Sequence, residues 1–305
     1  MARRKKGNPV HGWLVLDKPL EMTSTRAVGV LKRLFFAQKV GHAGTLDPLA
    51  TGILPIAFGE ATKTVPFAVE GEKVYRFTVR WGAETSTDDA EGEVVATGEA
   101  RPTVDEITAL LPQFTGEIMQ VPPRFSAIKV DGERAYALAR DGEEVELAAR
   151  PVVIDELRIV DVPDEDSVVL EARCGKGTYV RAIARDLGRA LGCRGHVIAL
   201  RRTRVGPFSE DDAVDLDEIE DAADAGEDLT TFLEPVEMAL GDVIELNVSA
   251  TDAADLAQGR SILIRGRDAP VLAGAAYAMS KGRIVALGEI EKGALHPTRV
   301  FNFGG

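Results

Sequence analysis

The chain has 305 residues, of which 45% are hydrophobic, and it carries a formal net charge of −13 at pH 7. This length accommodates one large domain or two ordinary ones, with a sizeable core. No apolar run approaches the ~18 residues of a membrane helix, and the basic start, MARRKKGNPV, has no apolar stretch behind it, so we expect neither a membrane segment nor a secretory signal.

The first segments predict a strand followed by a helix. Residues 12–17 are rich in branched and aromatic side chains, which is typical of a strand. Residues 24–36 carry apolar side chains at helical spacing and follow Thr23 and Ser24, which are good N-cap residues.

The next segment, GHAGTLDPLATG at residues 41–52, presents one carboxylate in a rigid setting. Pro48 fixes its own φ and pushes Asp47 towards extended geometry. Three glycines let the backbone approach other groups closely or adopt positive φ: Gly41, Gly44 and Gly52. From the residues alone, the segment is either an Asp-Pro turn between two elements or a loop that presents Asp47 close to His42.

Further strands and helices follow. Strand-like segments occupy residues 73–81, 152–160, 168–174 and 196–200. One helix starts at Thr103, where Glu106 completes a capping box, and another spans 178–191 and ends at Gly192. Because strands and helices do not alternate strictly, we expect an α+β fold around a mixed or antiparallel sheet.

Residues 124–151 predict a compact excursion from this pattern. RFSAIKV reads as a strand, Asp131 and Gly132 as a turn, and ERAYALARDG as a short helix closed by Gly142. A second strand, EEVELAAR, completes it.

The acidic charge is concentrated in residues 209–237, which contain thirteen Asp or Glu and no Lys, Arg or His. Removing these thirteen charges takes the net charge from −13 to zero, so local basic groups remain available for phosphates. These groups are Arg3, Arg4, Lys5 and Lys6; Arg181, Arg185 and Arg189; and Arg201, Arg202 and Arg204. We expect the acidic run to form a solvated helix and linker.

The last segment, residues 238–305, predicts a small and mostly β unit. Its strand-like segments are IELNVS, SILIRG, PVLAGAAYAM, RIVALGEIE and TRVFNF. A short helix is predicted at 252–258, capped by Thr251 at its start and by Gly259 at its end. A unit of about 60 residues is small for an independent core, so we expect it to pack against the rest of the chain.

Several motifs in one order resemble the TruB family of tRNA pseudouridine synthases. The loop at 41–52 is similar to the family's catalytic loop. The other motifs are GWLVLDKP (12–19), GEATKT (59–64), KVYRF (73–77), CGKGTYVRAIARDLG (174–188) and GHVIALRRTRVGPF (195–208). Because they run in family order over residues 10–208, the resemblance is specific.

This resemblance implies the organisation of the whole chain. Residues 1–208 would be a catalytic domain with a central mixed sheet and a cleft across it. Within it, residues 124–151 would be a thumb that clamps an RNA stem-loop. The acidic linker at 209–237 would lead to a PUA-like RNA-binding unit at 238–305.

The resemblance also implies catalytic roles. Asp47 would be the nucleophile, and Arg181 would pair with it, since a nearby guanidinium keeps a carboxylate ionised. Tyr75 would stack on the flipped uracil, and Tyr179 and Leu200 would line the base pocket. Whether Asp47 attacks C1′ or C6 of the nucleotide stays open.

Four further residues are assigned to RNA contact: His42, Lys18, Lys63 and Lys129. His42 would insert its flat ring into the base stack. Lys18 and Lys63 flank the site and either hold the loop or touch phosphate, and Lys129 would act from the thumb. Arg185 and Arg189 are assigned to a solvated face or to phosphate contact.

The implied reaction is the isomerisation of uridine 55 in the T loop of tRNA, by a monomer in the cytoplasm that needs no protein partner. No redox change occurs, so we expect no cofactor, and neither the scattered histidines nor the two cysteines have metal-ligand spacing. We expect Cys174 and Cys193 to be reduced thiols.

Two alternatives stay open. One is an RNA-binding factor that helps tRNA to fold and whose catalytic loop is vestigial. The other is a guide-dependent synthase with protein partners. The thumb-like insertion and the short C-terminal unit favour an enzyme that acts alone.

Overall fold

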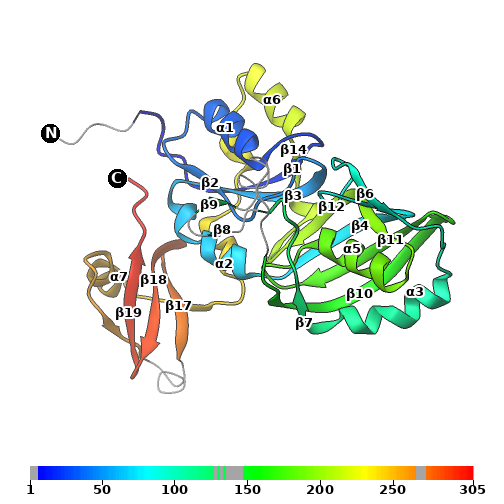
Figure 1. Cartoon of the computed structure of the whole chain (residues 1–305). Helices are drawn as coiled ribbons and strands as arrows, with labels where there is room; N and C mark the ends of the chain where they lie inside the picture. Colours follow the sequence, from blue (N-terminus) through cyan, green and yellow to red (C-terminus); the bar gives the residue numbers. More distant parts are fainter. Residues whose placement is uncertain (1–5, 127–128, 131–132, 135–146, 266–272, 305) are drawn as a thin grey trace.

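The computed structural model describes residues 6–126, 129–130, 133–134, 147–265 and 273–304. The strands of the large sheet are β1 (Gly12–Lys18), β2 (Val40–His42), β3 (Ala50–Phe58), β4 (Lys73–Trp81), β7 (Gly116–Gln120), β10 (Arg150–Asp164), β11 (Ser167–Cys174), β12 (Gly195–Val205), β13 (Phe208–Ser209) and β14 (Val214–Asp215). They lie in the order β14–β1–β3–β12–β4–β11–β10–β7, with β2 beside β3 and β13 beside β12 (Figure 1). Because β14 pairs parallel with β1 and β3 parallel with β12, while the rest are antiparallel, the predicted mixed sheet of an α+β fold is confirmed.

The described helices are α1 (Ser24–Leu34), α2 (Val65–Glu70), α3 (Val104–Leu110), α5 (Val180–Ala190), α6 (Leu216–Asp224) and α7 (Ala250–Ala257). Short 3-10 turns are η1 (Gly59–Lys63), η2 (Leu111–Phe114), η3 (Glu210–Asp212), η4 (Leu229–Phe232) and η5 (Val236–Leu240). The predicted N-cap at Thr23 and the capping box of Thr103 and Glu106 are confirmed. The cap predicted at Thr251 is wrong, because the Ser249 hydroxyl accepts the backbone N–H three residues on and starts α7 earlier.

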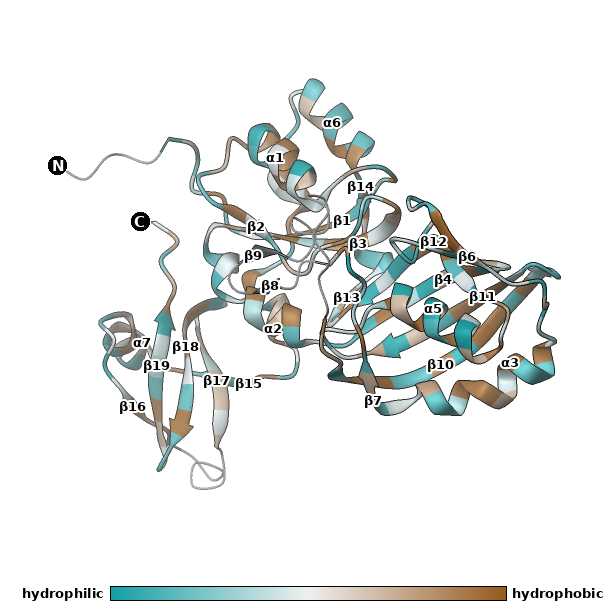
Figure 2. Ribbon diagram, viewed as in Figure 1, coloured by the Kyte–Doolittle hydropathy of each residue, from teal (hydrophilic) through white to brown (hydrophobic). Residues whose placement is uncertain are grey.

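β1 is buried on both faces, which positions the sheet between two cores. Leu14 and Leu16 pack in a core with residues of α1 and α5, whereas Trp13 and Val15 pack in a second core on the opposite face. Successive side chains of a strand point to opposite faces, so the run WLVL supplies both cores. The same alternation appears as brown and teal bands along the strands of the large sheet (Figure 2).

The central strand β3 is not among the strands that the sequence patterns predict. It pairs with β12 through residues 50–52 and with β2 through residues 56–58. Pro55 lies between these two stretches and opposite Val15 of β1. A proline in the middle of a sheet normally argues against a strand, because it has no N–H to donate to a neighbouring strand. Here Pro55 falls in the gap between β12 and β2, where neither strand pairs with β3.

The acidic segment 209–237 is folded onto the large sheet and is not a free linker. The predicted helix is present as α6, which buries Leu216, Ile219 and Ala222. Just before it, β14 pairs with β1. The apolar side of the segment therefore belongs to the main core, while its carboxylates face solvent.

The C-terminal strands form a five-stranded sheet of their own: β15 (Ile244–Asn247), β16 (Ile262–Leu263), β17 (Gly274–Ser280), β18 (Arg283–Glu291) and β19 (Ala294–Val300). This sheet packs against the rest of the chain as expected, because Tyr277, Met279 and Phe301 share a core with Trp13. The strand predicted at 298–303 ends at Val300. None of the described helices has the length and apolar character needed to cross a membrane.

Two short hairpins complete the described strands: β5 (Ala83–Thr85) with β6 (Val94–Thr97), and β8 (Lys129–Val130) with β9 (Glu133–Arg134). The second hairpin falls in the predicted excursion 124–151. Its turn at Asp131 and Gly132, and the helix expected to end at Gly142, lie outside the described residues.

Candidate active site

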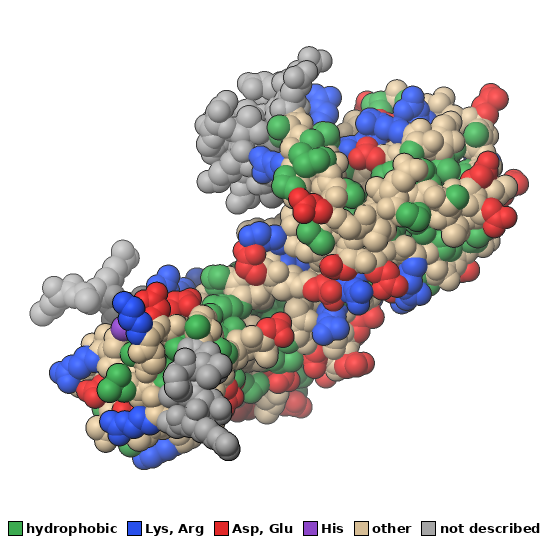
Figure 3. All heavy atoms as spheres, turned by 90° about the horizontal axis from the view of Figure 1, so that it is seen from below, with side chains coloured by type: hydrophobic (Ala, Val, Ile, Leu, Met, Phe, Trp, Pro, Cys, Tyr) green, Lys and Arg blue, Asp and Glu red, His purple; other side chains and the backbone are tan. Residues whose placement is uncertain are grey.

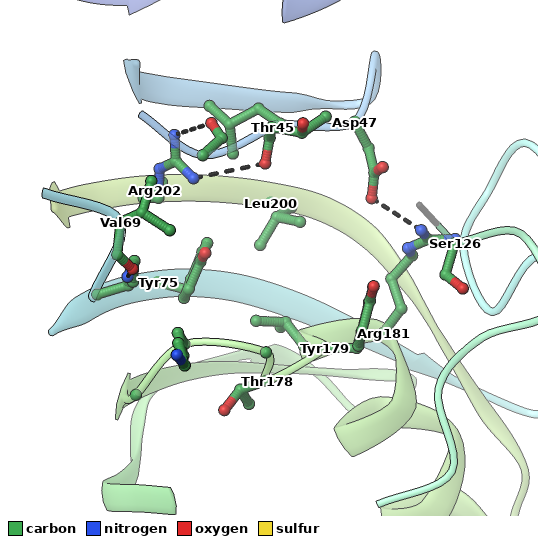
Figure 4. A pocket seen from close by; sticks show the side chains of 17 residues that line it. Thr45, Asp47, Val69, Tyr75, Ser126, Thr178, Tyr179, Arg181, Leu200 and Arg202 are labelled. Atoms are coloured by element: carbon green, nitrogen blue, oxygen red, sulfur yellow. Dashed lines mark hydrogen bonds and ion pairs between the residues drawn. The ribbon is translucent and has the colours of Figure 1, made fainter. Parts of the chain in front are cut away.

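A pocket of about 290 Å³ opens beside the loop at residues 43–49. Its lining comes from this loop, from β4, from the start of α5 and from β12 (Figure 4). The five side chains assigned to catalysis and to the base pocket all line it: Asp47, Tyr75, Tyr179, Arg181 and Leu200. Segments far apart in the sequence therefore present one acid, one guanidinium, two phenols and one apolar side chain to a single cavity.

Asp47 and Arg181 form an ion pair across this pocket. The distance from Asp47 Oδ2 to Arg181 Nη2 is 2.9 Å (Figure 4). The Arg181 side chain is only 6% exposed, whereas that of Asp47 is 39% exposed. The cation is thus buried behind the carboxylate, which remains accessible from the pocket. A guanidinium in this place gives the carboxylate a charge-assisted hydrogen bond that fixes its orientation.

Arg181 is held from behind by groups that the sequence patterns did not indicate. Its Nη1 lies 3.3 Å from Asp89 Oδ2 and donates to the carbonyl of Thr87, and its Nη2 donates to the carbonyl of Phe125. Asp89 is almost completely buried and also accepts from the Thr87 hydroxyl. These contacts fix the guanidinium so that it faces Asp47.

Of the other two arginines of α5, which were assigned to a solvated face or to phosphate contact, Arg185 is buried, whereas the Arg189 side chain is half-exposed. Arg185 pairs with Asp88 at 2.9 Å, and Arg189 pairs with Glu84. Burial raises the pKa of Asp88 to about 6, although Arg185 opposes the rise. Acidic residues of the segment 84–89 thus pair with successive arginines of α5.

The two tyrosines present neutral rings to the pocket. Burial raises the pKa of the Tyr75 hydroxyl and that of Tyr179, so both stay protonated near neutral pH. Gln120 holds the backbone of Tyr179 from both sides: its Nε2 donates to the Tyr179 carbonyl at 3.1 Å, and its Oε1 accepts the Tyr179 N–H at 2.8 Å. Because Tyr179 is the N-cap residue of α5, this clasp also fixes the start of the helix that carries Arg181.

Lys18 holds the loop that carries Asp47 and has no exposed surface. Its Nζ donates to the carbonyls of Pro19, Met22 and Pro48, at 2.9, 2.7 and 3.4 Å. Of the two roles considered for this lysine, the contacts favour loop holding over contact with phosphate. Burial lowers the pKa of Lys18 to about 8, and the nearby Asp47 opposes this shift.

The lowered pKa of Lys18 predicts a pH dependence of stability. Between about pH 8 and its unperturbed pKa of 10.5, the unfolded chain keeps this proton while the folded chain releases it, so the free energy of unfolding should rise with pH. Denaturant titrations across this range should show a smaller rise for Lys18→Met than for the wild type. Lys73, whose pKa is also lowered to about 8, is present in both proteins and cancels in the comparison. Parallel curves for the two proteins would contradict the assignment.

Of the remaining candidates, Lys63 and His42 are not among the residues that line the pocket. Lys63 contacts Glu60, donates to the Val300 carbonyl at 2.7 Å and lies over the Phe301 ring, so it joins η1 to the C-terminal strand. His42 is half-buried on β2, and burial lowers its pKa, which leaves a neutral flat ring. The backbone of Lys129 belongs to β8, and its side chain lies outside the described part of the structure.

On the face of the molecule that Figure 3 shows, the described cations lie among acidic side chains. Of the basic residues grouped in the sequence, Arg181, Arg185 and Arg202 are buried, and Arg201 pairs with Asp17 and Glu210. Clustering along the sequence therefore overstated the positive charge that is available at the surface.

Comparisons with known proteins agree with this geometry. The N-terminal domain model of the TruB family pseudouridylate synthases matches residues 32–180, and the C-terminal domain model of tRNA pseudouridylate synthase B matches residues 181–241. A protein of Bradyrhizobium diazoefficiens named tRNA pseudouridine synthase B is 60% identical over 100% of this chain and 91% of its own length. The chain belongs to the TruB family of pseudouridylate synthases. A protein of Caulobacter vibrioides with the same name is 56% identical over 99% of each sequence.

Solved structures share the fold of this TruB-family chain. A crystal structure of a Cbf5–Nop10–Gar1 complex matches with a TM-score of 0.72 and 24% identity, over 97% of this chain and 86% of that chain. A structure of an H/ACA ribonucleoprotein bound to a substrate RNA that contains 2′-deoxyuridine matches with a TM-score of 0.73 and 22% identity, over 99% and 92%. At these identities the likeness establishes the architecture alone.

The two TruB family models meet between Val180 and Arg181, inside α5. Asp47 and Tyr75 therefore belong to the N-terminal match, whereas Arg181 and Leu200 belong to the C-terminal one. The pocket needs residues from both matches, so this boundary does not separate two structural units.

Proposed function

We propose that this TruB-family chain converts uridine 55 in the T loop of tRNA to pseudouridine, with Asp47 as the nucleophile. The observation that carries the proposal is the exposed Asp47 carboxylate paired with the buried Arg181 guanidinium at the wall of a base-sized pocket. The names of the full-length relatives, which describe them as tRNA pseudouridine synthases, support tRNA as the substrate.

The reaction exchanges one bond to the ribose for another. The N1–C1′ bond breaks, the uracil turns, and C5 bonds to C1′; the proton on C5 leaves to water, and N1 takes up a proton. A carboxylate that first forms and then releases a covalent bond to the nucleotide suits such a two-stage exchange. Arg181 would hold Asp47 in place by a charge-assisted hydrogen bond until the base arrives.

The pocket must receive a base that has left its stack. Extruding a loop nucleotide costs less than extruding a paired one, and stacking on an aromatic ring offsets part of that cost. Tyr75 would supply the ring, with Tyr179 and Leu200 closing the sides. His42 and Lys129 remain candidates for contacts to the T stem-loop outside the pocket. We infer a cytoplasmic enzyme that acts as a monomer without a guide RNA or a protein partner.

Release of the C5 proton gives a direct test. A T-stem-loop RNA with tritium at C5 of uridine 55 should release tritium to water when it is incubated with the purified protein alone. The same RNA labelled at another loop uridine, with cytidine at position 55, should release none. If tRNA binds tightly but no tritium appears, the chain is an RNA-binding folding factor; if release requires a guide RNA, the chain is a guide-dependent enzyme.

A further inference from the structure

We propose that Arg202 is a positioning residue for Asp47, because it clamps the catalytic loop to the central strand from below. The inference rests on the proposed function for its catalytic consequence. The clamp itself is a property of the fold and can be measured separately.

The side chain of Arg202 is 1% exposed, and its N–H groups donate hydrogen bonds to the backbone of two segments. Its Nε donates to the Ile53 carbonyl of β3 at 2.8 Å. Its Nη2 donates to the Gly44 carbonyl at 3.0 Å and its Nη1 to the Thr45 carbonyl at 3.5 Å, both in the catalytic loop (Figure 4). One planar guanidinium therefore ties the loop, two residues before Asp47, to the strand that follows it.

Two glycines of the loop motif are shaped by the same arginine. Gly44 has φ +98°, and a Cβ there would lie 3.3 Å from Arg202 Nη1. Gly52 has φ +95°, and a Cβ there would lie 2.2 Å from the Arg202 carbonyl oxygen. The loop thus packs on the guanidinium near its start and on the arginine backbone at its end. A side chain at either position would crowd Arg202, which explains why both residues are glycine.

Arg202 also lies in the row of residues that crosses the sheet beneath the pocket. In register it faces Gly52 on β3 and Tyr75 on β4. Two other groups hold the loop from the opposite side: the Ser24 hydroxyl bonds to both the N–H and the carbonyl of Leu46, and Lys18 reaches Pro48. Arg202 is the side chain that ties Gly44 and Thr45 of the loop to β3 from β12, the strand that also carries Leu200 of the pocket.

A conservative variant removes the clamp without removing the charge. In Arg202→Lys, a single ammonium cannot reach carbonyls of both segments in the planar arrangement of a guanidinium. Because small displacements of a nucleophile are costly, we expect the single-turnover rate to fall by about 10- to 100-fold while the Kd for tRNA changes less than about threefold. Arg201→Lys is the matched control: its side chain lies on the same strand, pairs with Asp17 and Glu210, and should leave the rate within about threefold.

Hydrogen exchange of the loop amides measures the clamp without relying on catalysis. The N–H groups of Leu46 and Ala50 should exchange at least about tenfold faster in Arg202→Lys than in the wild type or in Arg201→Lys. If Arg202→Lys fails to fold, Gly44→Ala disturbs the same contact from the loop side and should give the same rate loss and faster exchange. Unchanged loop exchange, or a rate loss matched by an equal loss of tRNA affinity, would overturn the proposal. Faster exchange in a protein whose wild type makes no pseudouridine would support the clamp and refute only the proposed function.

Discussion

Replacing Asp47 by alanine should lower the single-turnover rate of pseudouridine formation by a factor on the order of 10⁴ or more, while tRNA still binds. In the proposed mechanism this carboxylate bonds to the nucleotide, and the described residues that line the pocket include no other acid. Arg181 keeps a partner in this variant, because Asp89 remains 3.3 Å from its Nη1. The fold should therefore change little.

Asp47→Asn is the sharper form of this experiment, because it keeps the shape of the side chain and removes only the charge and the nucleophile. Rates should be measured with enzyme in excess over a tRNA transcript, together with the Kd for the same transcript. Arg201→Lys, whose side chain pairs with Asp17 and Glu210 outside the pocket lining, serves as a control and should retain most of the rate. Turnover by Asp47→Asn within tenfold of the wild type would remove Asp47 from the mechanism.

Replacing Arg181 by methionine should cost both activity and stability. The rate should fall by about 10³-fold, because Asp47 loses the guanidinium that pairs with it and orients it. The free energy of unfolding should fall by about 3–5 kcal/mol, because Asp89, at 2% exposed, is left buried without its partner. Denaturant unfolding and single-turnover kinetics on the same preparation separate the two effects.

A second substitution distinguishes the two roles of Arg181. In the double variant Arg181→Met and Asp89→Asn, the buried charge is gone, so part of the lost stability should return. The activity should not return, since Asp47 still lacks its guanidinium. Recovery of the rate together with stability would mean that Arg181 serves the fold alone.

The sequence predicted the parts of the fold in which local patterns and tertiary structure agree. β1, β4, β10, β11 and β12 all contain a predicted strand, and the caps of α1 and α3 follow from side chains within one helical turn. β3 escaped prediction because Pro55 and the neighbouring glycines read as turn signals. Only the pairing around Pro55 shows why a proline fits a central strand there.

The candidate site also contains residues that the sequence predicted and residues that it did not. The motif resemblance places Asp47, Tyr75 and Arg181 in one site, and the structure brings these side chains to one pocket. The groups that support them were missed: Asp89 behind Arg181, Gln120 behind Tyr179, and Arg202 beneath the loop. Their contacts cross between distant segments, so no spacing along the chain reveals them.

The burial of charged segments was the property that the sequence predicted least well. Arginines at i, i+4 spacing on α5 look like a solvated stripe, but Arg185 is buried because Asp88 approaches from another segment. Likewise, α6 carries many carboxylates but buries its apolar side chains on the main core. In both places, contacts with a distant segment of the chain determine which side chains are buried. The periodicity of one helix describes only the residues of that helix, so it does not reveal these contacts.

The measurement that tests the central claim most directly is a map of pseudouridine in an unmodified tRNA transcript incubated with the purified protein. The transcript would be treated with carbodiimide and read by primer extension, without guide RNA or any other protein. The account predicts a single new stop that reports position 55 with the wild type, and none with Asp47→Asn. Stops elsewhere in the transcript, or an equal stop with Asp47→Asn, would contradict it.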